Sequence, residues 1–297
     1  MPRIGVDLGG TKIEAIVLND DGSVAARERV ATPQGDYAAT LAAIVGLVVR
    51  LEQFVDAPCS VGVGTPGALS PDTGRVRNSN STCLNNTRLD HDLGRHLARE
   101  VRIANDANCF ALSEAVDGAG RGAGCVFGVI VGTGTGGGIV IDGRLLRGRN
   151  AIAGEWGHNP LPWPHDEELP GPPCYCGKSG CIETFLSGPG LLAAYADPAV
   201  TTVEEIAHRA ECGEIAAERC LQRYEDRMAR ALASVINIVD PDVIVLGGGL
   251  SNMQRLYRNV PALWGNYVFS DVVRTRLSAP RHGDSSGVRG AAWLWPA

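Results

Sequence analysis

The sequence predicts an α/β protein built from two related halves, and two patterns carry this prediction. A strand, a glycine-rich turn and a returning strand occupy residues 4–18, and the same arrangement recurs over residues 125–141. Further strand patterns at residues 61–64, 101–104 and 242–246 are separated by segments of helical periodicity. The chain has 297 residues, enough for one large or two medium domains.

In the first half, residues 4–7 are expected to form a strand, residues 8–12 a tight turn and residues 13–18 the returning strand. This is a hairpin rather than a strand that feeds a helix. Residues 37–54 have helical spacing, and residues 61–64 and 101–104 form short strands. The second of these runs into Asn105 and Asp106 and then into an alanine-rich helix that ends near Gly118.

In the second half, residues 125–131 and 139–141 form strands around the turn at residues 132–138. A later helix carries one apolar stripe, made of Leu221, Tyr224, Met228, Leu232 and Val235. Asp240 and Pro241 end that helix, and residues 242–246 form a buried strand that leads into three glycines, 247–249. Residues 160–173 hold six prolines and three acidic residues, a composition typical of an exposed loop.

Composition excludes several classes of partner. The net charge is −6 with no block of lysine or arginine, so neither a nucleic-acid footprint nor a membrane-surface patch is expected. No run approaches the roughly 18 apolar residues of a membrane span, and residues 1–3 lead into a strand without a signal-peptide core. Nine cysteines, only three of them clustered, fit a reducing compartment. We therefore expect a cytoplasmic protein.

A metal site is expected in residues 158–181. His158, Cys174, Cys176 and Cys181 supply a Cys3His set, which is the number and type of ligands of a closed tetrahedral zinc site. Four protein ligands leave no open position for water, so the ion would be structural. It would hold Glu155 and Glu183, which flank the cluster. The alternative is that these are ordinary thiols, as we take the other six cysteines to be.

Two glycine-rich turns predict phosphate binding. Asp7-Leu-Gly-Gly-Thr-Lys12 places a carboxylate at a strand end beside glycines whose amides can approach phosphate oxygens, and Gly132-Thr-Gly-Thr-Gly-Gly-Gly138 repeats the cradle. Neither turn opens a helix, so the P-loop and dinucleotide fingerprints both fail. Each turn alone is more often a plain hairpin turn. Two of them together with glycines 247–249 favour a nucleotide.

Asn105 and Asp106 follow a strand, where open α/β sheets bind their ligands. A carboxylate there can take the proton of an alcohol during phosphoryl transfer. Locally, a helix N-cap is the simpler interpretation, and the two roles can coexist on neighbouring residues. Glu155 and Glu183 are candidate acceptors for polyol hydroxyls, the alternative being solvated surface glutamates.

These motifs occur in the order found in the ROK family of repressors and sugar kinases, which the chain resembles over nearly its whole length. The shared segments are Asp-x-Gly-Gly-Thr-Lys, Gly-x-Pro-Gly, Asn-Asp, Gly-Thr-Gly-x-Gly-Gly-Gly, Glu-x-Gly-His and Cys-x-Cys-Gly-x-x-Gly-Cys-x-Glu. Residues 78–82, 157–163 and 282–295 further resemble bacterial fructokinases of the mannofructokinase type. The long proline-rich insert between His158 and Cys174 fits that subgroup and departs from the shorter loops of glucokinases.

The resemblance implies the two-domain actin-like ATPase fold of the ribonuclease H type, with sugar and ATP in an interdomain cleft. We expect residues 1–118 to form the N-terminal domain, residues 119–285 the C-terminal domain, and a final helix near 286–297 to pack on the first.

The resemblance also implies a set of site residues. The catalytic base would be Asp106, and the sugar hydroxyls would be held by Asn80, Asn105, Asp106, Glu155, His158 and Glu183. Asp7 would organise Mg2+, and the nucleotide would be lined by Gly9, Gly10, Thr11, Lys12, Gly132, Thr133, Gly134, Gly247 and Gly248. Zn2+ would be bound by His158, Cys174, Cys176 and Cys181.

The implied activity is that of an ATP-dependent hexose kinase, a homodimer that phosphorylates the 6-hydroxyl. Fructose is the favoured acceptor, and mannose is the second candidate. The nearest alternative is a glucose or N-acetylglucosamine kinase, which shares every motif. A sugar-responsive ROK repressor is the alternative of another class, and it is disfavoured because no helix-turn-helix precedes the first strand. We further expect His158 to bind zinc through one ring nitrogen and sugar through the other.

Overall fold

The computed structural model describes residues 1–55 and 57–296, and the chain folds into two compact units. Unit 1 comprises Met1–Gly122, Gly138–Ala153 and the segment from Arg281 onward. Unit 2 comprises Ala123–Gly137 and Gly154–Pro280. The sequence-based division places residues 138–153 in the second domain, whereas in the structure they pack as part of unit 1.

Unit 1 is built on a five-stranded sheet of order β3-β2-β1-β4-β7. Its strands are β1 (Arg3–Leu8), β2 (Lys12–Leu18), β3 (Val24–Ala31), β4 (Ser60–Thr65) and β7 (Val101–Asn105). The predicted hairpin is confirmed, since β1 and β2 pair antiparallel with Asp7 opposite Glu14. β4 pairs parallel with both β1 and β7. The carboxyl ends of β1, β4 and β7 therefore meet at one edge.

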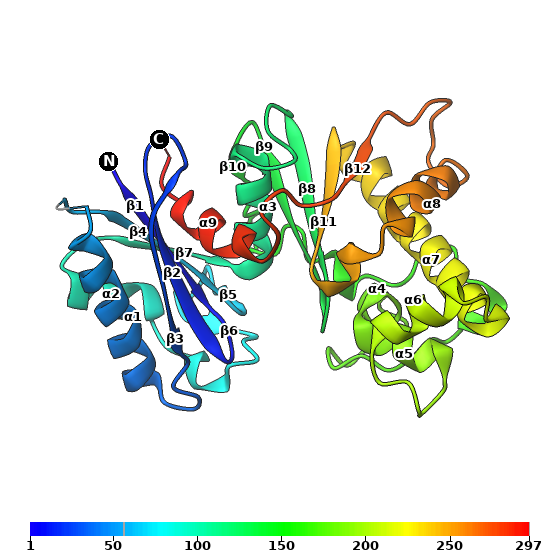
Figure 1. Cartoon of the computed structure of the whole chain (residues 1–297), viewed down its shortest axis with the longest axis horizontal. Helices are drawn as coiled ribbons and strands as arrows, with labels where there is room; N and C mark the ends of the chain where they lie inside the picture. The colour runs from blue at the N-terminus through cyan, green and yellow to red at the C-terminus, as the bar shows by residue number, and fades with distance from the viewer. Residues whose placement is uncertain (56, 297) are drawn as a thin grey trace. The chain divides into compact units, whose positions relative to one another are not determined.

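Helices cover both faces of this sheet (Figure 1). α1 (Tyr37–Glu52) and α2 (Leu89–Leu97) bury Ile44, Leu47 and Leu93 against one face, in the same core cluster as Ile4 and Val61. Asp36 caps α1 by accepting a hydrogen bond from the amide of Ala39. α3 (Asp106–Val116) and the short strands β5 (Ala68–Leu69) and β6 (Val76–Arg77) complete the first half of the chain.

α9 (Ser286–Ala292) lies on the other face of the sheet, and glycines make its close approach possible. A Cβ added to Gly62 of β4 would lie 1.9 Å from the carbonyl oxygen of Ala291. The helix ends at Ala292, earlier than the sequence-based limit of 297, because Trp293 caps it. Trp295 then donates from Nε1 to the carbonyl oxygen of Val61 at 2.7 Å, which fastens the C-terminal segment to β4.

The second sheet has the order β10-β9-β8-β11-β12. Its strands are β8 (Cys125–Val131), β9 (Thr135–Ile141), β10 (Arg144–Leu145), β11 (Val243–Gly247) and β12 (Arg276–Ser278). The helices of unit 2 are α4 (Ile182–Leu186), α5 (Gly188–Tyr195), α6 (Val203–Glu211), α7 (Ile215–Val239) and α8 (Arg255–Trp264). The predicted apolar stripe of α7 is confirmed, since all five of its residues are buried. Within the described residues no helix is both long and apolar enough to cross a bilayer.

Gly62→Ala should destabilise unit 1 by about 2–3 kcal/mol, because the added methyl group must displace the backbone of α9. The matched control is Gly265→Ala, where an added Cβ meets nothing within 4 Å and the backbone φ of −57° suits alanine. Urea unfolding of the two variants at equal protein concentration measures the difference. Equal midpoints for both variants would contradict the tight packing of α9 on β4.

Candidate active site

The candidate catalytic carboxylates lie at the carboxyl edge of the unit 1 sheet. Asp7 pairs with Gly64 of β4, and Gly64 pairs in turn with Ala104 of β7, so Asp7 and the end of β7 are two strands apart at one level. Asp106 follows two residues after Ala104 as the first residue of α3. The fold thus brings together two carboxylates that are 99 positions apart in the sequence. Ligands of open α/β sheets bind at this edge.

Asn105 and Asp106 were both candidates for the N-cap of α3, and Asp106 was also the candidate general base. Asn105 is the N-cap of α3, because its Oδ1 accepts from the amide of Asn108 at 3.0 Å. Asp106 accepts from the Asn105 side-chain amide at 2.9 Å and from the Ala107 amide at 2.8 Å. Both of these bonds end on Oδ1, which leaves Oδ2 for another partner. The cap and the candidate base are therefore different residues.

Both carboxyl groups have raised pKa values. Burial, followed by the charges of Asp106 and Glu14, raises the pKa of Asp7 to about 6 against the opposing charge of Lys12. The Asp106 side chain is accessible to solvent, yet the surrounding protein withdraws it from bulk water enough to raise its pKa. Raised carboxyl pKa values of this kind are common where a carboxylate must exchange protons or meet a cation.

The glycine turn between β1 and β2 has its carbonyl groups tied down. The carbonyl oxygens of Gly9 and Gly10 accept from the side chains of Thr32 at 2.7 Å and Gln34 at 3.0 Å. The Gly9 amide donates to the Lys12 carbonyl at 3.0 Å, which closes the turn. Gly10, Thr11 and Lys12 are exposed. A rigid turn with an exposed tip suits the phosphate-binding role expected of it.

Asn80 lies on the same unit, in a loop that follows β6. The side chain of Asn85 holds this loop by accepting from the Ser79 amide and donating to the Ser79 carbonyl, each at 2.9 Å. The next residue, Asn80, is exposed. Its backbone is therefore fixed while its side chain remains available to a ligand.

In unit 2, the second glycine turn is joined to a predicted sugar-binding residue. The turn at Gly132, Thr133 and Gly134 links β8 to β9, and the amide of Thr135 donates to Glu183 Oε2 at 2.8 Å. Glu183 stands in the first turn of α4. The expected nucleotide turn and the expected sugar-binding carboxylate are therefore in direct contact, a link that the sequence did not reveal.

The glycines after β11 meet the same turn region. Gly247 pairs with Ile130 of the parallel strand β8, so both strands end at one edge of the sheet. Gly248 has a φ of +81°, and a Cβ there would lie 2.3 Å from the carbonyl oxygen of Val131. Only glycine fits this position. The structure thus groups Gly132, Thr133 and Gly134 with Gly247 and Gly248, as expected for one binding edge.

The four expected metal ligands lie together in unit 2. The ligand atoms of His158, Cys174, Cys176 and Cys181 are all within 4.8 Å of one another. Cys174 Sγ is 3.6 Å from His158 Nδ1, and Cys176 Sγ is 3.6 Å from Cys181 Sγ. Tetrahedral zinc with bonds of about 2.0–2.3 Å sets its ligand atoms about 3.5–3.8 Å apart. The donor set and its spacing therefore fit zinc.

The segment that carries Glu155 and His158 is packed on β9. A Cβ added to Gly157 would lie 2.1 Å from the carbonyl oxygen of Thr135, and Trp156 donates from Nε1 to the carbonyl oxygen of Gly136 at 3.0 Å. Cys181 stands two residues before Glu183, so the metal cluster connects both glutamate-bearing segments. Glu155, His158 and Glu183 are consequently brought to the start of the same strand.

Tyr175 is a candidate site residue that the sequence analysis missed. Its hydroxyl is 2.9 Å from His158 Nε2, and its ring stands edge-on to the imidazole, with centroids 5.1 Å apart. Desolvation of the hydroxyl, followed by the charges of Glu183 and the neighbouring thiols and Glu155, raises its pKa to about 12. The only signal in the sequence was its place between two metal-ligand cysteines.

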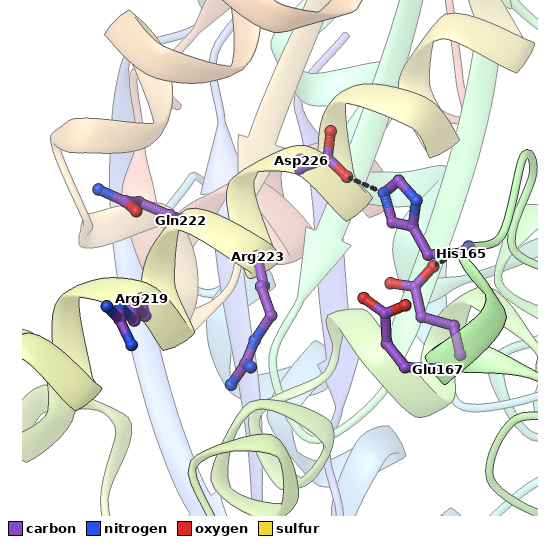
Figure 2. A pocket seen from close by; sticks show the side chains of 7 residues that line it. His165, Glu167, Arg219, Gln222, Arg223 and Asp226 are labelled. Atoms are coloured by element: carbon purple, nitrogen blue, oxygen red, sulfur yellow. Dashed lines mark hydrogen bonds and ion pairs between the residues drawn. The ribbon is translucent and has the colours of Figure 1, made fainter.

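The charged middle of the proline-rich insert is anchored to α7. Figure 2 shows a pocket lined by Arg219, Arg223 and Asp226 of α7 and by His165 and Glu167 of the insert, with Asp226 directed at the His165 ring at 3.5 Å. The buried Glu168 also lines this pocket, and it accepts hydrogen bonds from Arg230 at 2.9 Å and from Arg227 at 2.7 Å. The sequence-predicted site residues are not among those that line this pocket. The charges of the insert therefore serve to hold it against α7.

The family model described as the ROK family matches residues 3–297. The chain belongs to the ROK family. Two curated relatives are each 40% identical to it: the N-acetylgalactosamine kinase AgaK of Shewanella sp. (strain ANA-3), with 98% of this chain and 95% of that protein covered, and the N-acetyl-D-glucosamine kinase of Erwinia tasmaniensis, with 98% of both covered.

Solved structures agree with this assignment. The ROK hexokinase of Thermus thermophilus has a TM-score of 0.87 at 31% identity, over 98% of this chain and 97% of that one. A ROK glucokinase of Streptomyces griseus, solved with glucose and AMPPNP, has a TM-score of 0.78 at 26% identity over 99% of both chains. The expected ROK membership and two-domain α/β fold of the actin-like ATPase class are confirmed.

The metal site gives a testable prediction. Freshly purified protein should contain about one zinc per chain, and Cys176→Ser should lose the metal together with thermal stability, because zinc–ligand bonds contribute on the order of 10 kcal/mol to local folding. Cys212→Ser, which changes an exposed cysteine outside the cluster, should keep both. Elemental analysis and thermal melts measure the outcome. Zinc-free protein from a chelator-free preparation would refute the metal assignment.

Asp7 gives a prediction about pH and stability. Because its pKa is raised from 3.8 to about 6, the folded protein binds this proton more tightly than the unfolded chain. The group's contribution to stability is thus fully present below pH 3.8 and is lost as the pH rises through about 6. Asp7→Asn should therefore stabilise the protein at pH 7.5, on the order of 2 kcal/mol, and less at pH 5. Melting temperatures at both pH values test this, and a uniform or negative shift would contradict it.

Proposed function

We propose that this ROK protein is an ATP-dependent N-acetylhexosamine kinase that phosphorylates N-acetylglucosamine at its 6-hydroxyl. The observation that carries the proposal is the 40% identity, over 98% of the chain, to an N-acetylglucosamine kinase and to an N-acetylgalactosamine kinase. The fructose expectation rested on three short segments. The N-acetylglucosamine alternative fits the relatives better and replaces it.

The proposed general base is Asp106. Phosphoryl transfer to an alcohol needs a carboxylate to accept the hydroxyl proton as the oxygen attacks the γ-phosphorus in line. Asp106 has one oxygen held by Asn105 and Ala107 and the other available, so its orientation is fixed before the sugar binds. Its raised pKa makes it a better proton acceptor than an ordinary aspartate.

The phosphate groups of ATP are proposed to lie on the glycine turns, with Gly9, Gly10, Thr11 and Lys12 in unit 1 and Gly132, Thr133, Gly134, Gly247 and Gly248 in unit 2. Asp7 would hold the Mg2+ that accompanies the nucleotide, and that ion supplies charge neutralisation at the phosphates. The high pKa of Asp7 is consistent with this role, because an anionic carboxylate in a partly buried, negatively charged setting gains most from a bound cation.

The sugar hydroxyls are proposed to be held by Asn80, Asn105, Glu155, His158 and Glu183. Oε2 of Glu183 is already bound to the Thr135 amide, so its other oxygen is the one that meets the sugar. Zinc on His158, Cys174, Cys176 and Cys181 would fix the segments that carry these acceptors. It would do no chemistry, since its ligands are all protein atoms.

Asp106→Asn should lower kcat by roughly 10^2 to 10^4, the usual contribution of a general base, while the sugar Kd changes little. Asp72→Asn, at an exposed aspartate of the same unit, is the control and should turn over normally. Steady-state ADP release and calorimetry measure the two quantities. Near-normal turnover by a folded Asp106→Asn protein would leave Asp106 as no more than a helix-terminal residue.

The acceptor is tested by measuring ADP release with N-acetylglucosamine, N-acetylgalactosamine, glucose, mannose and fructose in parallel. We expect the largest kcat/KM with N-acetylglucosamine, because the chain shares its length and its motifs with kinases of that sugar. The next largest kcat/KM should be that of N-acetylgalactosamine, which differs from N-acetylglucosamine only in its configuration at C4. A preference for fructose would overturn the proposed specificity while leaving the kinase assignment in place.

A further inference from the structure

His158 has two ring nitrogens, and both are engaged within its own unit. Nδ1 is directed at the metal cluster, 3.6 Å from Cys174 Sγ. Nε2 is 2.9 Å from the hydroxyl of Tyr175. An imidazole nitrogen has one hydrogen-bonding position in its ring plane, so a further partner at Nε2 must take the place of the tyrosine.

The Tyr175 side chain is held by this bond and by the edge-on contact of its ring with His158. Its backbone is fixed in a tight turn, in which the Cys174 amide donates to the Lys178 carbonyl at 2.8 Å and the Gly177 amide to the Cys174 carbonyl at 3.0 Å. The residue itself, in contrast, is 83% exposed. Exposed side chains change rotamer within nanoseconds, so the hydroxyl can leave His158 without any movement of the metal cluster.

The surroundings of Tyr175 are those of the proposed sugar site. Tyr175 lies between the cluster residues Cys174 and Cys176, and the chain joins Glu155 and Glu183 to the same cluster through His158 and Cys181. A phenol hydroxyl and a sugar hydroxyl have the same donor and acceptor capacity. The tyrosine therefore occupies, with equivalent chemistry, a position at which a sugar hydroxyl would bind His158.

We propose that Tyr175 is an internal competitor for the sugar: its hydroxyl occupies His158 Nε2 in the free enzyme and is displaced by a hydroxyl of the bound N-acetylhexosamine. This inference rests on the proposed function, which assigns His158 to the sugar. Each binding event then breaks the Tyr175–His158 hydrogen bond, so the tyrosine lowers the affinity for every sugar that uses this nitrogen. Tyr175 thereby sets the sugar concentration at which the enzyme becomes saturated.

Tyr175→Phe tests the proposal, because it removes the hydroxyl and keeps the ring. Loss of one competing hydrogen bond should tighten the sugar Kd about three- to tenfold. The KM for N-acetylglucosamine should fall with it, and the KM for MgATP should change less. Tyr267→Phe is the matched control, since it removes a hydroxyl bonded to Asp226 elsewhere in unit 2 and should leave the sugar Kd unchanged.

Calorimetry with N-acetylglucosamine alone measures the affinities, and zinc analysis confirms that each variant keeps its metal. In the sugar-free protein, the NMR signal of the His158 ring should shift in Tyr175→Phe and stay in place in Tyr267→Phe. An unchanged Kd would overturn the competition, and a weakened Kd would make Tyr175 a sugar contact instead. With either of these two results, the proposed function survives as long as the unsubstituted protein phosphorylates N-acetylglucosamine. If it phosphorylates none of the five sugars, the proposed function itself fails.

Discussion

Parallel strand pairing is the constraint on which the candidate active site depends. Parallel strands begin together and end together, so whatever follows them gathers at one edge of the sheet. In unit 1, the register from β1 through β4 to β7 sets Asp7 beside the end of β7, where Asp106 opens α3. In unit 2, the pairing of β8 with β11 brings the turn after Val131 beside Gly248. A slip of one residue in either register would separate these groups.

Electrostatics at the unit 1 edge opposes stability and favours binding. Desolvation raises the cost of ionising both carboxyl groups, and the charge of Asp106 adds to that cost for Asp7. A protein selected only for stability would not keep two carboxylates in this arrangement, because neutral side chains of the same shape would cost less. The arrangement becomes favourable when a cation neutralises one carboxylate and a proton moves to the other. Its presence in a well-packed unit supports a functional interpretation.

The sequence predicted the local elements well because their signals are local. The first hairpin, the α7 stripe, the N-cap role of Asn105 and the cysteine spacing can each be recognised in one continuous stretch of the chain. All four appear in the structure. Two features could not be predicted in this way. The Thr135–Glu183 hydrogen bond joins residues 48 positions apart. Residues 138–153 pack in unit 1, although β9 begins in unit 2. Both depend on packing rather than on a motif. The sugar could not be derived either, because the same acceptor residues suit many hexoses.

The Thr135–Glu183 hydrogen bond gives unit 2 a direct path between its two proposed ligands. Glu183 is proposed to meet the sugar through one oxygen and is fixed by the glycine turn through the other, at 2.8 Å. Gly134 enforces the distance, since a Cβ there would lie 2.7 Å from the same carboxylate oxygen. Phosphate binding that shifts the turn would therefore shift the carboxylate, and a sugar that orders the carboxylate would order the turn. Such coupling is reciprocal by thermodynamic necessity, so an ordered turn also makes the carboxylate a better acceptor for sugar. Zinc near Cys181 would limit this movement to the short stretch between the metal ligand and Glu183.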